Sequence, residues 1–163
     1  MSTLKPYQEK IISLLIRQEL LVAELYRFFA GLYPDLREFW NDMAKQEMEH
    51  ATWIEYLSNK ARNGEVIFKE EKIRTYTVES FLKYLEENLA KVKERAPTPK
   101  AAFSLALSME NSLLLKRIYY HFQCANPELS AVLTGLRVKL EDHRKRIEVQ
   151  AAPFNSPPSG PCR

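Results

Sequence analysis

The sequence is poor in glycine, and it has no long hydrophobic run. It contains four glycines in 163 residues, and its nine prolines cluster at a few points. Because glycine and proline interrupt helices and form turns, this distribution favours long helices over a turn-rich β protein. No apolar stretch approaches the length needed to span a bilayer, and the first residues, Met1 to Pro6, do not form a secretory signal.

Cysteine is also scarce, and positive charge is not concentrated anywhere. The two cysteines, Cys124 and Cys162, are isolated, so they form neither a metal-binding C-x-x-C pair nor a disulfide framework. We therefore expect a reducing, cytoplasmic location. The net charge is only +3, and no basic run is interleaved with aromatic residues, so neither nucleic acid nor membrane is indicated as a partner.

The remaining composition is that of a soluble globular protein, with 45% hydrophobic and 28% charged residues. The length suits one domain with a substantial core. We place this domain at residues 1–152. Residues 153–163 are rich in proline and serine, cannot bury a core, and are expected to form a disordered tail.

Apolar residues recur with helical spacing along most of the domain. The pattern predicts two antiparallel hairpins of long helices, at residues 6–32 and 36–62, and at residues 99–123 and 127–150. A further helix is expected at about residues 78–92, in the long crossover between the hairpins, after a loop at residues 65–77. The predicted fold is thus an all-α four-helix bundle with an additional crossover helix.

The most informative stretch lies in the second predicted helix, where Glu47 and His50 are three residues apart. Residues at this spacing lie on one face of a helix, so the carboxylate and the imidazole can point at the same object. Trp40, Met43 and Ile54 follow the same register and place both side chains on the inward face. A buried carboxylate is costly unless it is paired or bound to a metal.

Each of the other three long helices carries a polar residue on its predicted apolar face. Glu24 lies between Leu21 and Phe28 in the first helix, whereas Glu19 falls off that face and is expected to be solvated. Glu110 lies in the middle of the third apolar stripe, and His143 lies on the fourth. We therefore expect Glu24 to share the interior with the Glu47 and His50 pair.

The spacing of these residues is similar in the two hairpins. Glu24 precedes His50 by 26 residues, and Glu110 precedes His143 by 33. The difference of seven residues is about two helical turns, or one additional turn on each arm of the second hairpin. Lengthening both arms equally keeps the inward residues level, so all of these side chains can meet at mid-height in one bundle.

This pattern resembles the ferritin-like di-iron carboxylate superfamily, and within it the rubrerythrin-like domains. That resemblance implies a ferritin-like bundle in which Glu24, Glu47, His50, Glu110 and His143 bind one or two iron ions, and manganese or zinc would accept much of the same ligand set. It also implies an oxidoreductase that reacts with peroxide or oxygen. The chain lacks the C-x-x-C pairs of a rubredoxin module, so the resemblance implies a separate electron-donor protein or reductase.

One position departs from the family pattern. The residue three before His143 is Leu140 rather than glutamate, and the adjacent Glu141 is rotated by about 100° on an ideal helix. Glu141 would reach the site only if the helix were wound differently there, for example by a π-bulge. Leu140 therefore favours a second hypothesis, a ferritin-like domain with an incomplete metal site that acts as a binding or structural module.

Other interpretations of the same residues stay open at this point. Glu24 and Glu110 can be interior carboxylates that are bonded to tyrosine, to arginine or to each other, with Tyr26 and Arg117 near them in the sequence. His143 alone would suit a core histidine, and we expect His121 to be one. A hydroxylase shares the ligand set, and a homo-oligomer also stays open. Nothing in the sequence specifies the subunit assembly that an iron-storage cage needs.

Overall fold

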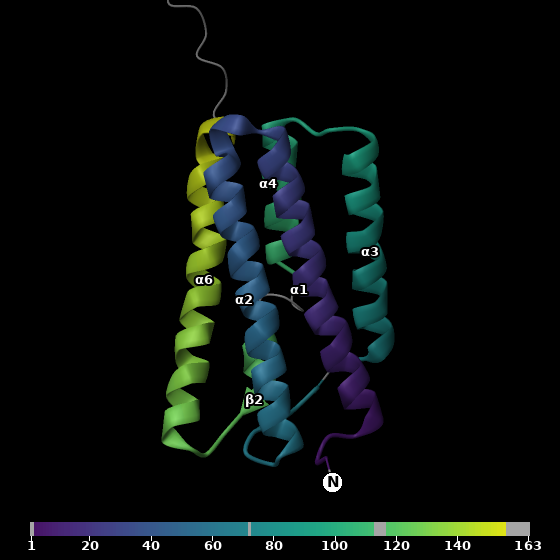
Figure 1. The fold of residues 1–163 in the computed structure, drawn as a ribbon, viewed down its shortest axis with the longest axis vertical. Helices are drawn as coiled ribbons and strands as arrows, with labels where there is room; N and C mark the ends of the chain where they lie inside the picture. Colours follow the sequence, from purple (N-terminus) through teal and green to yellow (C-terminus); the bar gives the residue numbers. More distant parts are fainter. Residues whose placement is uncertain (1, 72, 113–116, 156–163) are drawn as a thin grey trace, which may run out of the picture.

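The computed structural model describes residues 2–71, 73–112 and 117–155, and within them the chain is almost entirely helical (Figure 1). The prediction of an all-α fold is confirmed. The α-helices are α1 (Pro6–Leu32), α2 (Arg37–Arg62), α3 (Thr75–Glu94), α4 (Pro99–Glu110) and α6 (Pro127–Asn155). Two 3-10 helices, η1 (Pro34–Leu36) and η2 (Ile118–His121), and two short strands, β1 (Ile67–Phe68) and β2 (Phe122–Gln123), complete the described structure.

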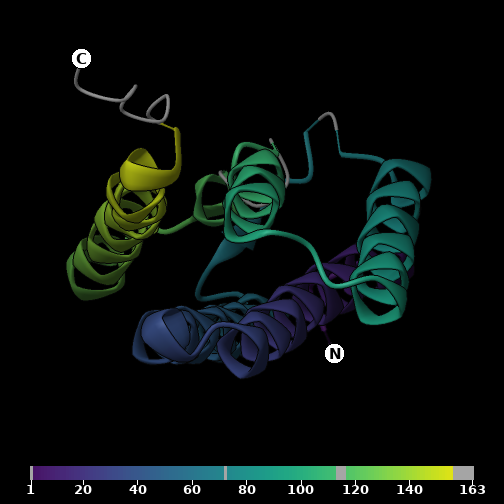
Figure 2. The same ribbon diagram turned by 90° about the horizontal axis from the view of Figure 1, so that it is seen from above.

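The helices are arranged in two layers. Viewed from above, α1 and α2 lie side by side, with α4 and α6 opposite them and α3 flanking α1 (Figure 2). The crossover helix that the sequence predicts is therefore present as α3, which begins at Thr75, three residues earlier than expected. None of the described helices is both long enough and apolar enough to cross a membrane.

The interior contains two apolar clusters along the length of the bundle. One includes Leu15, Ile54 and Leu140 and extends to the two strands. The other includes residues from the opposite halves of the same helices, among them Val22, Met43 and Ile147. On α1, α2 and α6, a buried polar residue lies between the residue of the first cluster and the residue of the second. The buried glutamates and histidines thus form a polar layer between two apolar clusters.

The second hairpin differs from the prediction. The helix expected to continue to residue 123 ends at Glu110, and the chain then forms η2 and β2. Strand β2 pairs antiparallel with β1, with Phe68 opposite Phe122. The segment 65–77, expected to be a loop, therefore contributes a strand. Because the two arms are not equal helices, the explanation of the spacing by one additional turn on each arm is wrong.

The last helix is longer than expected. Helix α6 continues through Pro153 to Asn155, so the first residues of the predicted tail are helical. Phe154 accounts for this extension, because its ring packs against Phe103 of α4 with 5.3 Å between the ring centroids. The rest of the predicted tail, including Cys162, lies outside the described residues.

Candidate metal centre

Four of the five residues singled out in the sequence meet at mid-height in the bundle. Glu47 and His50 come from α2, Glu110 is the last residue of α4, and His143 comes from α6. All four are buried. The fifth residue, Glu24, is not part of this cluster.

The expectation that Glu24 faces the interior is wrong. Its side chain is 50% exposed, and its Oε1 lies 2.6 Å from Nζ of Lys93 on α3. Its neighbours on this side of α1, Leu20 and Arg27, are exposed as well. Glu24 therefore forms a surface ion pair between α1 and α3, away from the buried polar layer.

Glu19 occupies the interior position instead, although the sequence pattern placed it in solvent. Glu19 is only 1% exposed. It follows Leu15 by four residues and precedes Tyr26 by seven, so these three side chains lie on one face of the helix. The buried face of α1 is wide because α1 packs against both α2 and α3. Leucines at the edge of this face, such as Leu21, make the apolar stripe read from the sequence appear centred nearer to Glu24 than it is.

The five buried residues form two groups of three that could each hold a metal ion. Glu19, Glu47 and His50 make the first group, and Glu47, Glu110 and His143 make the second. In each group, one ligand atom from each residue lies within 4.8 Å of the others. The rings of the two histidines are near each other, with 5.3 Å between their centroids.

Glu47 belongs to both groups because its two carboxylate oxygens face different histidines. Its Oε2 lies 3.1 Å from Nδ1 of His50, which is also 3.4 Å from Oε2 of Glu19. Its Oε1 lies 2.5 Å from Nε2 of His143, which is also 3.1 Å from Oε1 of Glu110. A carboxylate placed in this way can bridge two cations.

Burial and charge together determine the protonation of the site. Burial raises the pKa of Glu19 to about 8, and the neighbouring Glu47 adds to this rise against the effect of His50. Burial would also raise the pKa of Glu47, but His143 and His50 outweigh it and hold that pKa well below its ordinary value. In the metal-free site Glu47 is thus ionised, and it lies between the rings of His50 and His143.

The histidines respond to the same charges. Burial would lower the pKa of His143, but Glu47 and Glu110 outweigh it and raise the pKa to about 10. The pKa of His50 is likewise raised well above its ordinary value by Glu47 and Glu19, against burial. Protons therefore supply the positive charge that balances the buried carboxylates when no metal is bound.

Tyr26 holds Glu110 in place at the upper end of the polar layer. Its hydroxyl is fully buried and donates a hydrogen bond of 2.6 Å to Oε1 of Glu110. Burial, together with the nearby Glu110 and Glu47, raises the pKa of Tyr26 well above its ordinary value. The sequence allows a hydrogen bond between an interior carboxylate and a tyrosine. The structure contains such a bond, at Glu110 and not at Glu24.

The fourth carboxylate of a complete site is missing from α6. Leu140 is buried within the apolar cluster below His143. Glu141 points away, because its side chain is 42% exposed and its Oε1 lies 2.7 Å from Nη2 of Arg144. Helix α6 is a continuous α-helix here, so no π-bulge turns Glu141 toward the site.

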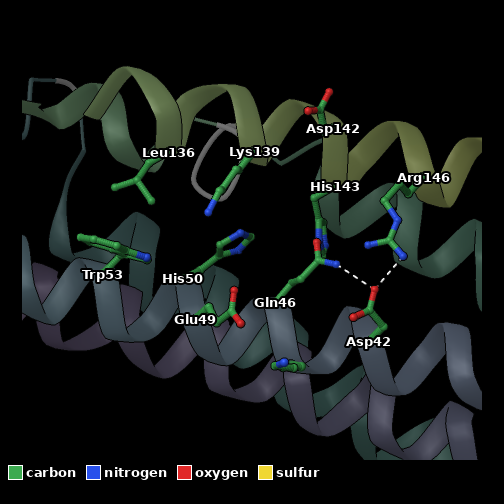
Figure 3. Close-up of a pocket in the computed structure, with 11 residues that line it drawn as sticks. Asp42, Gln46, Glu49, His50, Trp53, Leu136, Lys139, Asp142, His143 and Arg146 are labelled. Carbon is green, nitrogen blue, oxygen red and sulfur yellow. Dashed lines mark hydrogen bonds and ion pairs between the residues drawn. The ribbon is translucent and has the colours of Figure 1, made fainter. Parts of the chain in front are cut away.

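A groove of about 350 Å³ between α2 and α6 reaches the histidine side of the cluster (Figure 3). His50 and His143 both line it, together with Trp53, Leu136 and Lys139. The groove is open to solvent and carries both acidic and basic residues at its rim. The groove therefore leads from solvent toward the two histidines, whose side chains are 8% (His50) and 0% (His143) exposed.

The chemistry of the cluster suits metal ions. Glutamate oxygens and imidazole nitrogens are ligands that iron, manganese and zinc accept. Oε1 of Glu47 is buried, and it forms an ion pair with Nε2 of His143. A buried network of charges contributes little to stability by itself, so a binding role explains this network better than a stabilising one. These residues fit a pair of metal ions.

His121 lies outside this cluster and has a structural role. It is buried beside Phe68, and its Nδ1 lies 2.9 Å from the backbone oxygen of Lys69, to which it donates a hydrogen bond. This contact supports the chain at the point where β1 and β2 pair.

Comparison with known proteins gives one family. A protein-family model described as Rubrerythrin matches residues 10–104. The matched region contains Glu19, Glu47 and His50, the whole of the first group, and ends before Glu110 and His143. No match was found among curated proteins or among solved structures.

Proposed function

Since the chain belongs to the rubrerythrin family of ferritin-like di-iron proteins, we propose that it is a non-haem iron oxidoreductase. It would react with peroxide or oxygen and take its electrons from a separate donor protein. The observation that carries this proposal is the position of Glu47, whose two oxygens face two groups of ligands.

The ligand assignment follows from these two groups. Glu19 and His50 would hold one ion, Glu110 and His143 the other, and Glu47 would bridge them. A bound iron pair would supply two electrons, one from each ion, for the reduction of an oxidant. Three carboxylates and two imidazoles leave coordination positions open, and the groove between α2 and α6 gives a small oxidant a route to the histidine side.

Two further features of the chain bear on this proposal: the proton of Tyr26 and the small number of cysteines. The raised pKa of Tyr26 keeps a proton on its hydroxyl oxygen, next to Oε1 of Glu110. Tyr26 therefore stays neutral, and we assign it the role of positioning Glu110 in the second group. The 163 residues contain two cysteines, too few for the four of a rubredoxin-type iron site, which is why the proposal includes a separate donor.

The proposal is tested by iron content after anaerobic loading with ferrous iron and removal of the excess. We expect iron at both positions in the wild type, loss of one ion in Glu19→Gln, and loss of both in Glu47→Ala. Glu24→Gln is the matched control, because Glu24 lies on the same helix but on the surface. Iron content that is unchanged in Glu47→Ala would refute the assignment.

A second candidate function is a ferritin-like domain that acts as a binding or structural module. The observation in its favour is Leu140, a buried apolar side chain where the family pattern has a carboxylate. Wild-type protein that keeps its fold but retains no iron, manganese or zinc would support this alternative. Retention of metal by the wild type and its loss in Glu47→Ala would exclude it.

A further inference from the structure

A row of polar contacts leads from the surface of α6 across the groove to His143 (Figure 3). Nη2 of Arg146 lies 2.7 Å from Oδ2 of Asp42. The same carboxylate oxygen accepts a hydrogen bond of 3.0 Å from Nε2 of Gln46. Oε1 of Gln46 in turn lies 3.0 Å from Nδ1 of His143. We call Arg146, Asp42 and Gln46 the relay.

Arg146, at the outer end of the relay, determines the direction of every hydrogen bond in it. A guanidinium can only donate, and an ionised carboxylate can only accept. Arg146 also holds the pKa of Asp42 below its ordinary value, which keeps Asp42 ionised. The amide nitrogen of Gln46 must therefore face Asp42, and its oxygen must face His143. That oxygen accepts a hydrogen bond only if Nδ1 of His143 carries the proton.

We infer that Gln46 is a positioning residue that selects the metal-binding nitrogen of His143. This inference rests on the proposed function. With Nδ1–H held by Gln46, the nitrogen that is free to bind a cation is Nε2, which faces Glu47 and Glu110. Partners of this kind that orient a ligating histidine affect metal affinity by about 10–100-fold.

The two histidines of the site thus present different ring nitrogens. His50 directs Nδ1 at Glu47 and Glu19. His143 directs Nε2 at its carboxylates, because its Nδ1 faces the relay. The structure therefore assigns Nδ1 coordination to His50 and Nε2 coordination to His143. This difference can be measured directly.

The experiment uses zinc, which accepts the same ligands and is diamagnetic. Long-range proton–nitrogen NMR spectra of the zinc-loaded protein report which nitrogen of each histidine is protonated, and the sequence contains only three histidines. In the wild type we expect a protonated Nδ1 and a metal-bound Nε2 for His143, and the reverse for His50. A His143 whose Nδ1 binds zinc would overturn the inference.

Three variants separate positioning from a general effect on the fold. Gln46→Met has a similar length but cannot donate a hydrogen bond and accepts one only weakly. We therefore expect a mixture of His143 tautomers and zinc affinity at this position that is about 10–100-fold weaker. Gln46→Glu keeps an acceptor for Nδ1–H and should retain the wild-type tautomer. Glu49→Gln, which changes another residue of the same groove, should leave the His143 signals unchanged.

The outcomes for the relay and for the metal site are distinguishable. Wild type that binds zinc at both positions, with His143 signals that are the same in Gln46→Met, would overturn the relay and leave the proposed function intact. Wild type that binds neither zinc nor iron would refute the proposed function and the positioning role together. In that case a slowly exchanging Nδ1–H of His143 in the metal-free protein would show that its hydrogen bond to Gln46 exists without a metal to orient.

Discussion

Glu19 is the residue at which burial has the clearest effect on protonation. Its carboxyl group is fully enclosed between α1 and α2 and faces the ionised Glu47. Burial raises its pKa from 4.5 to about 8, so the folded metal-free protein holds a proton that the unfolded chain releases in this range. The folded state is therefore favoured at low pH with respect to this group.

We predict that the metal-free protein loses stability as the pH rises from about 4.5 to 8. A raised pKa in the folded state contributes stability below the unfolded value, and the contribution is lost as the pH passes through the folded value. His143, raised from 6.5 to about 10, acts with the same sign over a higher range. Urea unfolding at several pH values, with a chelator present, measures the slope.

Glu19→Gln should flatten this fall below pH 8, because glutamine has no proton to lose. Glu24→Gln is the control, since Glu24 is exposed and paired with Lys93 and should leave the slope as in the wild type. An equal slope in wild type and Glu19→Gln would show that Glu19 does not carry the proton.

The choice between Glu19 and Glu24 also shows what a single stripe of apolar residues cannot decide. A helix that packs against one neighbour has a narrow buried face, which the large apolar residues identify. Helix α1 contacts two neighbours, and its wide buried face includes Gln18, Glu19 and Tyr26. The signal that could have indicated Glu19 is its spacing from Leu15 and Tyr26. Glu47, His50, Glu110 and His143 lie on narrower faces, and they are buried as the sequence pattern predicts.

At the scale of elements, α6 determines how complete the second group can be. Leu140 lies three residues before His143, so the two side chains share a face of the helix. It is buried against apolar side chains such as Tyr119 and Leu136. A carboxylate here would lie in this apolar cluster, on the same face of the helix as His143.

We predict that Leu140→Glu acts in opposite directions with and without metal. In the metal-free protein a newly buried carboxyl group should lower the free energy of unfolding by about 1–3 kcal/mol. In the presence of zinc the additional ligand should strengthen binding at the second position. Denaturation with zinc and with chelator measures both effects, and Leu136→Glu is the control at the groove. Zinc affinity no higher than in wild type would mean that this position does not face the metal.

The end of α4 shows where local patterns stop being sufficient. Leu113, Leu114 and Ile118 continue the helical spacing of α4, so the sequence predicts one helix to residue 123. In the structure, Asn111 caps α4, and the chain instead reaches β2, which pairs with β1. That pairing joins segments more than 50 residues apart, and no pattern within either segment indicates it. Residues 113–116 lie outside the described part of the chain.

At the scale of the whole molecule, the polar layer separates two apolar clusters and interrupts the core. Buried charges without a metal stabilise a fold weakly, because their desolvation offsets their attraction. A metal that binds only the folded state adds stability by mass action. The fold and its metal site are therefore coupled energetically, and the coupling can be measured on the intact protein.

We predict that the metal-loaded protein melts at a higher temperature than the protein in excess chelator. With free metal at 100 times the dissociation constant, the gain is about 2.7 kcal/mol, which corresponds to roughly 5–10 °C. Thermal unfolding followed by circular dichroism measures the difference, and Glu47→Ala should abolish it. Equal melting temperatures for the wild type under both conditions would favour the structural-module alternative.

The site is also divided between early and late parts of the chain. Glu19, Glu47 and His50 all belong to the α1–α2 hairpin, whose contacts are local, whereas Glu110 and His143 arrive with α4 and α6. Local contacts form faster than those that close long loops. The first group can therefore assemble before the second. Until α6 packs against the hairpin, Oε1 of Glu47 lacks its partner His143. The order in which the chain folds would then set the order in which its two ions enter.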